Sequence, residues 1–274
     1  MKSSIREFLR EDIGSGDITS NLVSPPDMMA KGQILCKEPC ILAGVEEACL
    51  VFEELGANVT YAKRDGAPAK KGEVILKVNG HARALLAGER LALNLIMQLS
   101  GIATQTKELV RRCRKVNRRV KVAATRKTTP GFREFEKRAV SLGGGNPHRF
   151  GLFDAILIKN NHIRLAGGIK EALGAAKLGS GSKRVEIEVE SPQQAFEALE
   201  NGADVIMLDN FKPADAKILY TRLKKKRPSV TIEVSGGITP ENITQYAKAA
   251  DVISLGRLTY SVRSVDFSMR IEKA

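Results

Sequence analysis

Cations, carboxylates and glycines follow the ends of short apolar runs in the second half of the chain. In order they are Thr125, Arg126, Lys127, Lys159, Glu188, Asp209, Ser235, Gly236, Gly237 and Gly256. Fixed cations suit carboxylates and phosphates, two acids suit a divalent metal, and small residues before a helix suit a phosphate. Taken singly, each residue also fits an ordinary polar loop. Together they predict a site for a substrate that carries several negative charges.

A further candidate is the pair His148-Arg149, which follows the glycines 143–145 after only two residues. A flexible loop would explain the glycines but not the adjacent histidine and arginine, so we expect the pair to contribute to the same site. A lone histidine is more often a structural hydrogen-bonding residue than a ligand. That interpretation is preferred for His162 and His81.

Glu186, Glu188 and Glu190 alternate along one predicted strand, so their side chains share one face. In a barrel that face is either the interior mouth or the side covered by helices. Three acids cannot all be buried without partners, and a metal site needs only the best placed of them. Glu190 best fits a solvated strand end.

The elements that carry these residues form a repeating pattern of apolar strands and amphipathic helices, which is typical of βα units around a parallel sheet. The predicted strands span residues 120–125, 155–158, 185–189, 205–208, 231–234 and 252–255. The helices between them begin near Gly131, Gly168, Pro192, Pro213 and Pro240. A barrel, open or closed, and a doubly wound sheet both fit this order. Because no Gly-x-Gly-x-x-Gly follows the first strand, we favour the barrel, whose site lies at the carboxyl ends of the strands.

The first half of the chain has a different pattern. Residues 30–79 contain short β-like runs around one helix at 45–55, which predicts a small α/β sandwich domain. A long helical pattern over 82–116, with an interruption expected at Ser100-Gly101, then links it to the barrel. We therefore expect an α/β protein with a sandwich domain over 1–101 and a parallel βα barrel of the TIM type, with about six strands, over 102–259. Residues 260–274 are expected to pack with the first domain.

Composition excludes several classes of protein. The chain is 43% hydrophobic and 27% charged, and it has no run of 18 uncharged apolar residues, so we expect no membrane span. Residues 1–10 are charged and helix-like rather than typical of a signal peptide, which predicts a cytoplasmic protein. The four cysteines, on dissimilar segments, show no zinc-type spacing with the three histidines. They are expected to be reduced structural thiols.

The net charge of +13 is concentrated in two basic clusters, defined by the seven cations within 111–121 and the four of 224–227. Both stand at predicted helix ends before strands, where cations favour the helix dipole and face solvent. A solvated basic face is therefore preferred. Nucleic-acid binding and steering of an anionic substrate are the alternatives.

A set of motifs in the same order resembles the quinolinate phosphoribosyltransferase family, also called carboxylating nicotinate-nucleotide pyrophosphorylases. They are residues 9–19, Glu89-Arg90, Leu93-Asn94, 100–103, Thr-Arg-Lys-Thr-Thr-Pro-Gly at 125–131, His148-Arg149, Ile158-Lys159, Leu-Asp-Asn at 208–210 and Ser-Gly-Gly-Ile at 235–238. The segment 125–131 is the most specific of them. The resemblance covers nearly the whole chain.

The resemblance implies an enzyme that converts quinolinate and phosphoribosyl pyrophosphate, with Mg²⁺, to nicotinate mononucleotide, pyrophosphate and carbon dioxide on the route to NAD. It also implies a homodimer or a higher homo-oligomer. The residues that would hold the quinolinate carboxylates are Arg126, His148, Arg149 and, from the other subunit, Arg90.

The remaining roles implied by the resemblance concern the phosphates and the ribose. Lys127 and Lys159 would face the phosphates or the anionic edge of the substrate, and Glu188 and Asp209 the metal-bound ribose pyrophosphate; these four are the expected catalytic residues. The anion cradle would be completed by Thr125, Ser235, Gly236, Gly237, Leu255, Gly256 and Arg257.

The chain departs from the family pattern at Asn160, Pro147 and Tyr260, where aspartate, asparagine and histidine are common. One fewer carboxylate near Lys159 would alter metal affinity. A related paralog associated with molybdate uptake shares the Thr-Arg-Lys segment, but it tends to lose the Ile-Lys-x-Asn-His pattern that residues 158–162 retain. The transferase is therefore preferred over this paralog and over a nucleic-acid binder.

Overall fold

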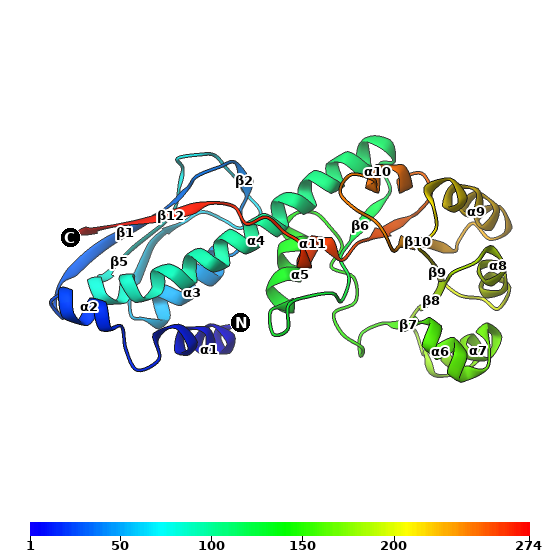
Figure 1. Cartoon of the computed structure of the whole chain (residues 1–274), viewed down its shortest axis with the longest axis horizontal. Helices are drawn as coiled ribbons and strands as arrows, with labels where there is room; N and C mark the ends of the chain where they lie inside the picture. The colour runs from blue at the N-terminus through cyan, green and yellow to red at the C-terminus, as the bar shows by residue number, and fades with distance from the viewer. The chain divides into compact units, whose positions relative to one another are not determined.

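The computed structural model describes all 274 residues and shows two compact units (Figure 1). The first comprises residues 1–107, 134–144 and 261–274, and the second comprises residues 108–133 and 145–260. None of the helices combines the length and the apolar character that a membrane crossing requires. Each unit has its own sheet.

The first unit is built on an antiparallel sheet in the order β12-β1-β5-β3. These strands are β1 (Met29–Cys36), β3 (Asn58–Ala62), β5 (Val74–His81) and β12 (Phe267–Lys273). Strand β1 alternates between exposed and buried residues, as expected for a sheet with one face in the core. A short pair, β2 (Cys40–Ile41) and β4 (Pro68–Ala69), and the helices α1 (Lys2–Ile13), α2 (Ile18–Val23) and α3 (Val45–Glu54) complete this part.

Helix α4 (Ala82–Val116) runs for 35 residues without the interruption expected at Ser100-Gly101. Both residues are used for packing instead. The Ser100 hydroxyl donates to the carbonyl of Ala43 and accepts its amide, each at 3.1 Å. A Cβ at Gly101 would lie 2.4 Å from the carbonyl oxygen of Arg263, so glycine is needed for the close approach of another segment. The expected break was wrong because tertiary contacts, rather than a turn, explain the two residues.

Helix α5 (Arg133–Leu142) lies within the sequence range expected for the barrel, yet residues 134–144 group with the first unit. Arg138 forms ion pairs with Glu46, Glu47 and Asp65, at 2.7, 2.9 and 2.9 Å respectively. Gly143 allows the end of the helix to approach α4, because a Cβ there would lie 2.5 Å from the Ala103 carbonyl oxygen. The chain thus returns to the first unit between the first two strands of the second.

The second unit contains a six-stranded sheet in the order β6-β11-β10-β9-β8-β7, with every pairing parallel. The strands are β6 (Lys121–Ala123), β7 (Ile156–Ile158), β8 (Val185–Val189), β9 (Val205–Asp209), β10 (Thr231–Ser235) and β11 (Val252–Ser254). They lie where the apolar runs predicted them. The first strand pairs with the last and the others follow in chain order, which is the order of a barrel rather than of a doubly wound sheet.

This barrel is open, because β6 and β7 form the two edges of the sheet. The strands alternate with α6 (Asn160–Ala166), α7 (Ile169–Gly179), α8 (Pro192–Glu200), α9 (Pro213–Lys226), α10 (Ile243–Tyr246) and α11 (Arg257–Tyr260). Proline begins α8 and α9, and Ser191 caps α8 by accepting the amide of Gln194. The predicted helix near Pro240 is present as the short α10.

Strand β8 is buried along its whole length, and its two faces differ in chemistry. Val185, Ile187 and Val189 have at most 1% exposure, while the alternate residues Glu186 and Glu188 point the other way. The alternation in the sequence allows two alternatives for this face, the interior of the barrel and the side covered by helices. The acids face the interior, since Glu188 lines a cavity at the strand ends. The period of two therefore puts carboxylates inside the barrel.

Candidate active site

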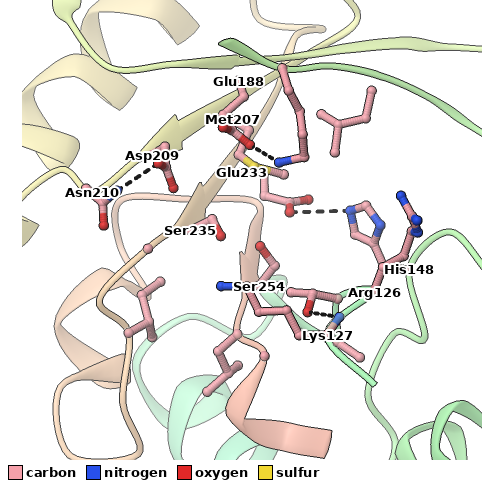
Figure 2. A pocket seen from close by; sticks show the side chains of 18 of the residues that line it. Arg126, Lys127, His148, Glu188, Met207, Asp209, Asn210, Glu233, Ser235 and Ser254 are labelled. Carbon is pink, nitrogen blue, oxygen red and sulfur yellow. Dashed lines mark hydrogen bonds and ion pairs between the residues drawn. The ribbon is translucent and has the colours of Figure 1, made fainter. Parts of the chain in front are cut away.

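A cavity of about 570 Å³ lies at the carboxyl ends of the strands in the second unit (Figure 2). Parallel strands end at the same edge of a sheet, so residues far apart in the sequence meet there. The sequence-predicted residues that line it are Thr125, Arg126, Lys127, His148, Arg149, Lys159, Glu188, Asp209, Ser235, Gly236, Gly237, Leu255 and Gly256. The fold thus brings nearly the whole predicted set together.

The acidic side of the cavity is formed by Glu188 and Asp209 on the neighbouring strands β8 and β9. Glu188 forms an ion pair with Lys159, which directly follows β7. Burial raises the pKa of Asp209, and the charge of nearby Glu188 raises it further. Both effects disfavour the charged form of Asp209, which a cation in the cavity would stabilise.

The basic side is formed by residues that follow β6. The segment turns at once, because the amide of Lys127 donates to the Thr125 hydroxyl at 3.1 Å and the Thr259 hydroxyl donates to the Lys127 carbonyl at 2.6 Å. The Nε atom of Arg126 is buried without a hydrogen-bond partner. A buried donor of this kind gains from an acceptor that a ligand supplies.

Arg149 lies beside Arg126 in the same wall. Burial lowers the pKa of Arg149, and the positive charge of Arg126 lowers it further. Two partly buried guanidinium groups placed side by side would be stabilised by an anion between them. This pair is therefore the natural place for a carboxylate.

The segment that carries His148 and Arg149 runs beside β6, at the open edge of the sheet. Asn146 donates its amide to the Val122 carbonyl and accepts the amide of Ala124, at 2.8 and 2.9 Å. His148 has a positive φ of 57°, and its amide donates to the Asn146 side chain at 2.8 Å. The backbone is thus fixed where the two side chains enter the cavity.

The glycine turn after β10 packs closely against the residue that follows the neighbouring strand β9. Gly236 has a φ of +83°, and a Cβ there would lie 2.7 Å from the amide nitrogen of Asn210. That amide donates to the carbonyl of Ser235 at 2.9 Å. The turn at Ser235-Gly236-Gly237 therefore presents backbone atoms to the cavity, as an anion cradle requires.

Several candidates lie elsewhere. Arg90 is exposed on α4 in the first unit. Arg257, at the start of α11 in the second unit, does not line the cavity. His162 has the structural role expected for it, since its Nδ1 accepts the amide of Lys159 at 2.9 Å. Glu190 is exposed, as expected, and accepts a hydrogen bond from Asn160.

Sequence reasoning missed a group of lining residues. They are Ala124, Leu157, Met207, Asn210, Glu233, Ile238, Ser254 and Tyr260. Asn210 and Ile238 lie within the family motifs, and Tyr260 is a departure from them. Glu233 carried a signal of its own, because it interrupts the apolar strand Thr231–Ser235, where it is 3% exposed. A charged residue inside a short apolar run is a reason to expect a specific partner.

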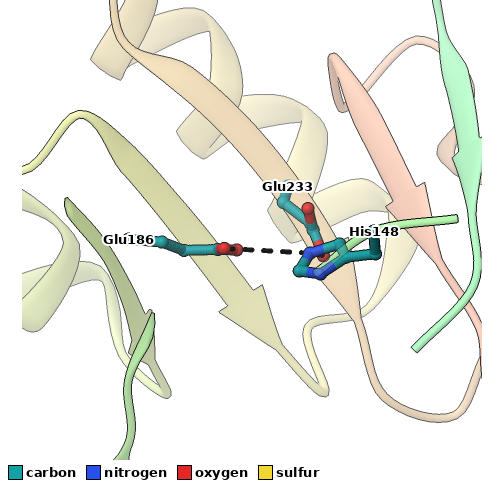
Figure 3. A group of neighbouring side chains, drawn as sticks. All are labelled: His148, Glu186 and Glu233. Carbon is teal, nitrogen blue, oxygen red and sulfur yellow. Dashed lines mark ion pairs between the residues drawn. The ribbon is translucent and has the colours of Figure 1, made fainter. Parts of the chain in front are cut away.

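That partner is found in the interior of the barrel, where Glu233 and Glu186 converge on His148 (Figure 3). The Nε2 atom of His148 lies 3.4 Å from Glu233 Oε1 and 3.7 Å from Glu186 Oε2. Burial raises the pKa of Glu186, and the charge of Glu233 raises it further. The three side chains form one buried polar cluster.

Comparison with known protein families gives two matches that together span most of the chain. The family model for the quinolinate phosphoribosyl transferase N-terminal domain matches residues 17–100, and the model for the C-terminal domain matches residues 102–270.

Individual relatives agree with these matches. A Methanocaldococcus jannaschii protein named "Probable nicotinate-nucleotide pyrophosphorylase (carboxylating)" is 46% identical over 97% of this chain and 95% of its own length. The human nicotinate-nucleotide pyrophosphorylase (carboxylating) is 38% identical over 88% of this chain and 82% of its own. A crystal structure of NadC from Streptococcus pyogenes matches with a TM-score of 0.92 and 37% identity, covering 99% of this chain and 96% of that one. The chain therefore belongs to the quinolinate phosphoribosyl transferase family.

Proposed function

We propose that this protein transfers the phosphoribosyl group of phosphoribosyl pyrophosphate to quinolinate with loss of carbon dioxide, giving nicotinate mononucleotide and pyrophosphate for NAD synthesis. The observation that carries this proposal is the cavity itself. It places partly buried arginines opposite two carboxylates and a glycine turn, all at one barrel mouth. Quinolinate bears two carboxylates and its co-substrate several phosphate charges, so both need such cations.

Arg126 and Arg149 are the proposed ligands of a quinolinate carboxylate. The unpartnered Nε of Arg126 and the mutual repulsion of the two guanidinium groups support this assignment. Planar arginine side chains can donate two parallel hydrogen bonds to one carboxylate. The family resemblance assigns His148 to the same wall.

Lys127, Lys159 and the glycine turn are the proposed ligands of the phosphates. Lys127 is exposed in the cavity wall, and the backbone at 235–237 and 255–257 lies at the ends of the last two strands. Barrel enzymes often bind a phosphate at this place. Arg257, which does not line the cavity, remains in this set only as a prediction from the resemblance.

Glu188 and Asp209 fit a Mg²⁺ ion, because they offer hard oxygen ligands on adjacent strands, and burial and the charge of Glu188 both raise the pKa of Asp209. When bound there, the ion would neutralise charge on the pyrophosphate. Lys159 forms an ion pair with Glu188. With the ion bound, Lys159 would either turn toward the substrate or keep the Glu188 carboxylate in place. Magnesium and its ligands are part of the proposal.

The protein's own contribution is mainly orientation and neutralisation. The bond from the ribose anomeric carbon to pyrophosphate breaks as the ring nitrogen of quinolinate bonds to that carbon. The ring nitrogen then carries a positive charge and can accept the electrons left when the adjacent carboxylate departs as carbon dioxide. A proton replaces that carboxylate. Glu188 and Asp209, beside the ribose, favour the positive charge that develops on the sugar.

The oligomeric state and location belong to this proposal as well. We propose a homodimer in which Arg90 completes the site of the neighbouring subunit. The exposure of Arg90 on α4 supports this assignment. The cytoplasmic location expected from the N-terminal residues stays a prediction.

Incubation of the purified protein with quinolinate, phosphoribosyl pyrophosphate and Mg²⁺ should yield nicotinate mononucleotide and carbon dioxide in equal amounts. Nicotinate in place of quinolinate is the matched control, since it lacks the second carboxylate and releases no carbon dioxide. Absence of product from quinolinate, with the Lys159→Ala variant as the blank, would refute the proposal and favour the molybdate-associated paralog.

A further inference from the structure

Within the buried cluster of His148, Glu186 and Glu233, neither carboxylate has a role in the reaction described above. Glu233 is 3% exposed and Glu186 is 8% exposed, and the Oε1 atom of each is buried without a hydrogen bond. Barrel interiors are normally filled with branched apolar side chains. Two acids held there without full hydrogen bonding are costly to stability, which indicates a function for them.

Three such side chains could in principle hold a metal ion, but the hydrogen bonds of His148 argue against it. Its Nδ1 accepts the amide of Arg149 at 2.8 Å, so Nδ1 carries no proton. In the uncharged ring the proton is then on Nε2, the atom that faces both carboxylates. Nε2 therefore presents its proton to the acids, at 3.4 Å from Glu233 and 3.7 Å from Glu186. A metal at Nε2 would move the proton to Nδ1, where it would meet the Arg149 amide hydrogen.

His148 also lines two cavities. One is the candidate active site, and the other is a cavity of about 400 Å³ whose lining includes residues at the opposite ends of the strands, such as Lys121, Arg184 and Thr231. Glu233 lines both cavities as well. Holding this ring in place thus holds the inner wall of the candidate active site.

We propose that Glu233, assisted by Glu186, is a positioning residue for the anion-binding wall. The oxygens of the two acids keep the proton of His148 on Nε2, which leaves Nδ1 to accept the backbone amide of Arg149 and so to set the direction in which its guanidinium enters the cavity. His148 then acts by orienting Arg149 rather than by donating a hydrogen bond to the substrate. This inference rests on the proposed function for the identity of the anion.

The tautomer of His148 tests the inference without any substrate. Nitrogen NMR of protein labelled at histidine is tractable, because the chain has three histidines. His148→Gln identifies the signal by its loss. We expect an unprotonated Nδ1 and a protonated Nε2 in the wild-type protein, and loss of this fixed preference in Glu233→Leu. A protonated Nδ1, or a signal that moves on titration with Zn²⁺ or Mn²⁺, would overturn the inference in favour of a metal site.

Kinetics of three variants provide the second test. Glu233→Leu removes the acceptor and should raise the KM for quinolinate about tenfold or more, with little change in the KM for phosphoribosyl pyrophosphate. Glu233→Gln retains an acceptor oxygen and should recover most of that loss. Glu197→Gln, on the exposed face of α8, is the matched control and should behave as wild type.

Equal increases in both KM values, or no difference between the Gln and Leu variants, would refute a positioning role. If Glu233→Leu fails to fold, the tautomer of His148 in the wild-type protein still tests the inference. Failure of the proposed function is distinguishable, since it would leave the wild-type protein without activity while the NMR result stands.

Discussion

At the scale of single residues, structural and functional cations differ in their partners. Arg138 is held by three carboxylates in the first unit, one of them fully buried Glu47. Arg126 has a buried Nε with no partner. An arginine already neutralised by acids is part of the folded structure, whereas one left unpaired in a cavity wall is available to a ligand.

Replacement of Arg126 should affect one substrate more than the other. In Arg126→Ala we expect the KM for quinolinate to rise by about thirtyfold, equivalent to about 2 kcal/mol, because a charged hydrogen bond is lost. The KM for phosphoribosyl pyrophosphate should change much less. Steady-state kinetics with each substrate varied in turn would measure both.

Arg126→Lys is the matched control, since it keeps the charge but not the planar pair of donors. It should fall between wild type and Arg126→Ala. Equal losses for the two substrates would show that Arg126 had been assigned to the wrong one.

The cysteine thiols should be unreactive in the folded protein. Burial raises the pKa of Cys49 and of Cys113 to about 11, and it also raises the pKa of Cys40. Because the thiolate is the reactive form, its fraction at pH 8 is about a hundredfold lower for a thiol of pKa about 11 than for an ordinary thiol of pKa about 9. Labelling with a chromogenic disulfide at pH 8 should be slow until guanidinium is added, and immediate reaction of the native protein at these thiols would contradict the prediction.

At the scale of elements, the strand ends and the turns that follow them form the site. The turn after β10 depends on Gly236, whose φ of +83° and contact with Asn210 leave no room for a side chain. A positive φ does not by itself imply a close contact, since Gly144 has a φ of +82° but a Cβ there would have no atom within 4 Å. Comparison of the two glycines therefore separates the effect of backbone conformation from the effect of steric overlap.

Gly236→Ala should therefore cost more than Gly144→Ala. We expect about 1 kcal/mol from the positive φ in Gly144→Ala, and about 2–4 kcal/mol in Gly236→Ala, where overlap is added. Gly236→Ala should also raise the KM for phosphoribosyl pyrophosphate. Urea unfolding and kinetics would measure the two effects, and identical behaviour of the variants would show that the turn adjusts freely.

At the scale of the whole molecule, most of the basic cluster 224–227 is paired within the fold. In the cluster 224–227, Lys224 pairs with Asp251 at 2.8 Å, Lys226 with Glu200 at 3.2 Å, and Arg227 donates to the Ala203 carbonyl. These contacts support the interpretation of a solvated structural face over a surface built for nucleic acid.

Replacement of Arg111, Arg112, Arg118 and Arg119 by glutamine should leave kcat and both KM values within about twofold of wild type, because surface charges are screened. Retention on immobilised RNA at increasing salt would be measured in parallel. Salt-sensitive retention of the wild type that the replacement abolishes would instead favour nucleic-acid binding.

The proposed sharing of Arg90 predicts complementation between two inactive variants. A mixture of Arg90→Ala and Lys127→Ala subunits, unfolded and refolded together, should recover about a quarter of wild-type activity, because half of the dimers are mixed and each has one intact site. Each variant refolded alone is the control. No recovery, with mixed dimers demonstrated by mass spectrometry, would place Arg90 in its own chain's site.

Local sequence patterns were enough to predict each strand of the barrel and most of its site. Apolar runs of three to five residues, from Lys121–Ala123 to Val252–Ser254, are bounded by turn residues, and both signals come from neighbours in the chain. Because parallel strands end together, knowing the strands was sufficient to expect Arg126, Glu188 and Asp209 in one place. The family motifs added their chemical roles.

Tertiary structure alone decided which segments meet. Residues 134–144 join the first unit, β12 pairs with β1, and α4 continues through Ser100-Gly101, since each outcome depends on contacts with residues far along the chain. The acid cluster around His148 is of the same kind. Glu186 and Glu233 stand 47 residues apart. Only the packing of β8 and β10 into one sheet, with both acids on its inner face, brings the two carboxylates to one imidazole. Periodicity determines the face of a strand, but packing determines what that face meets.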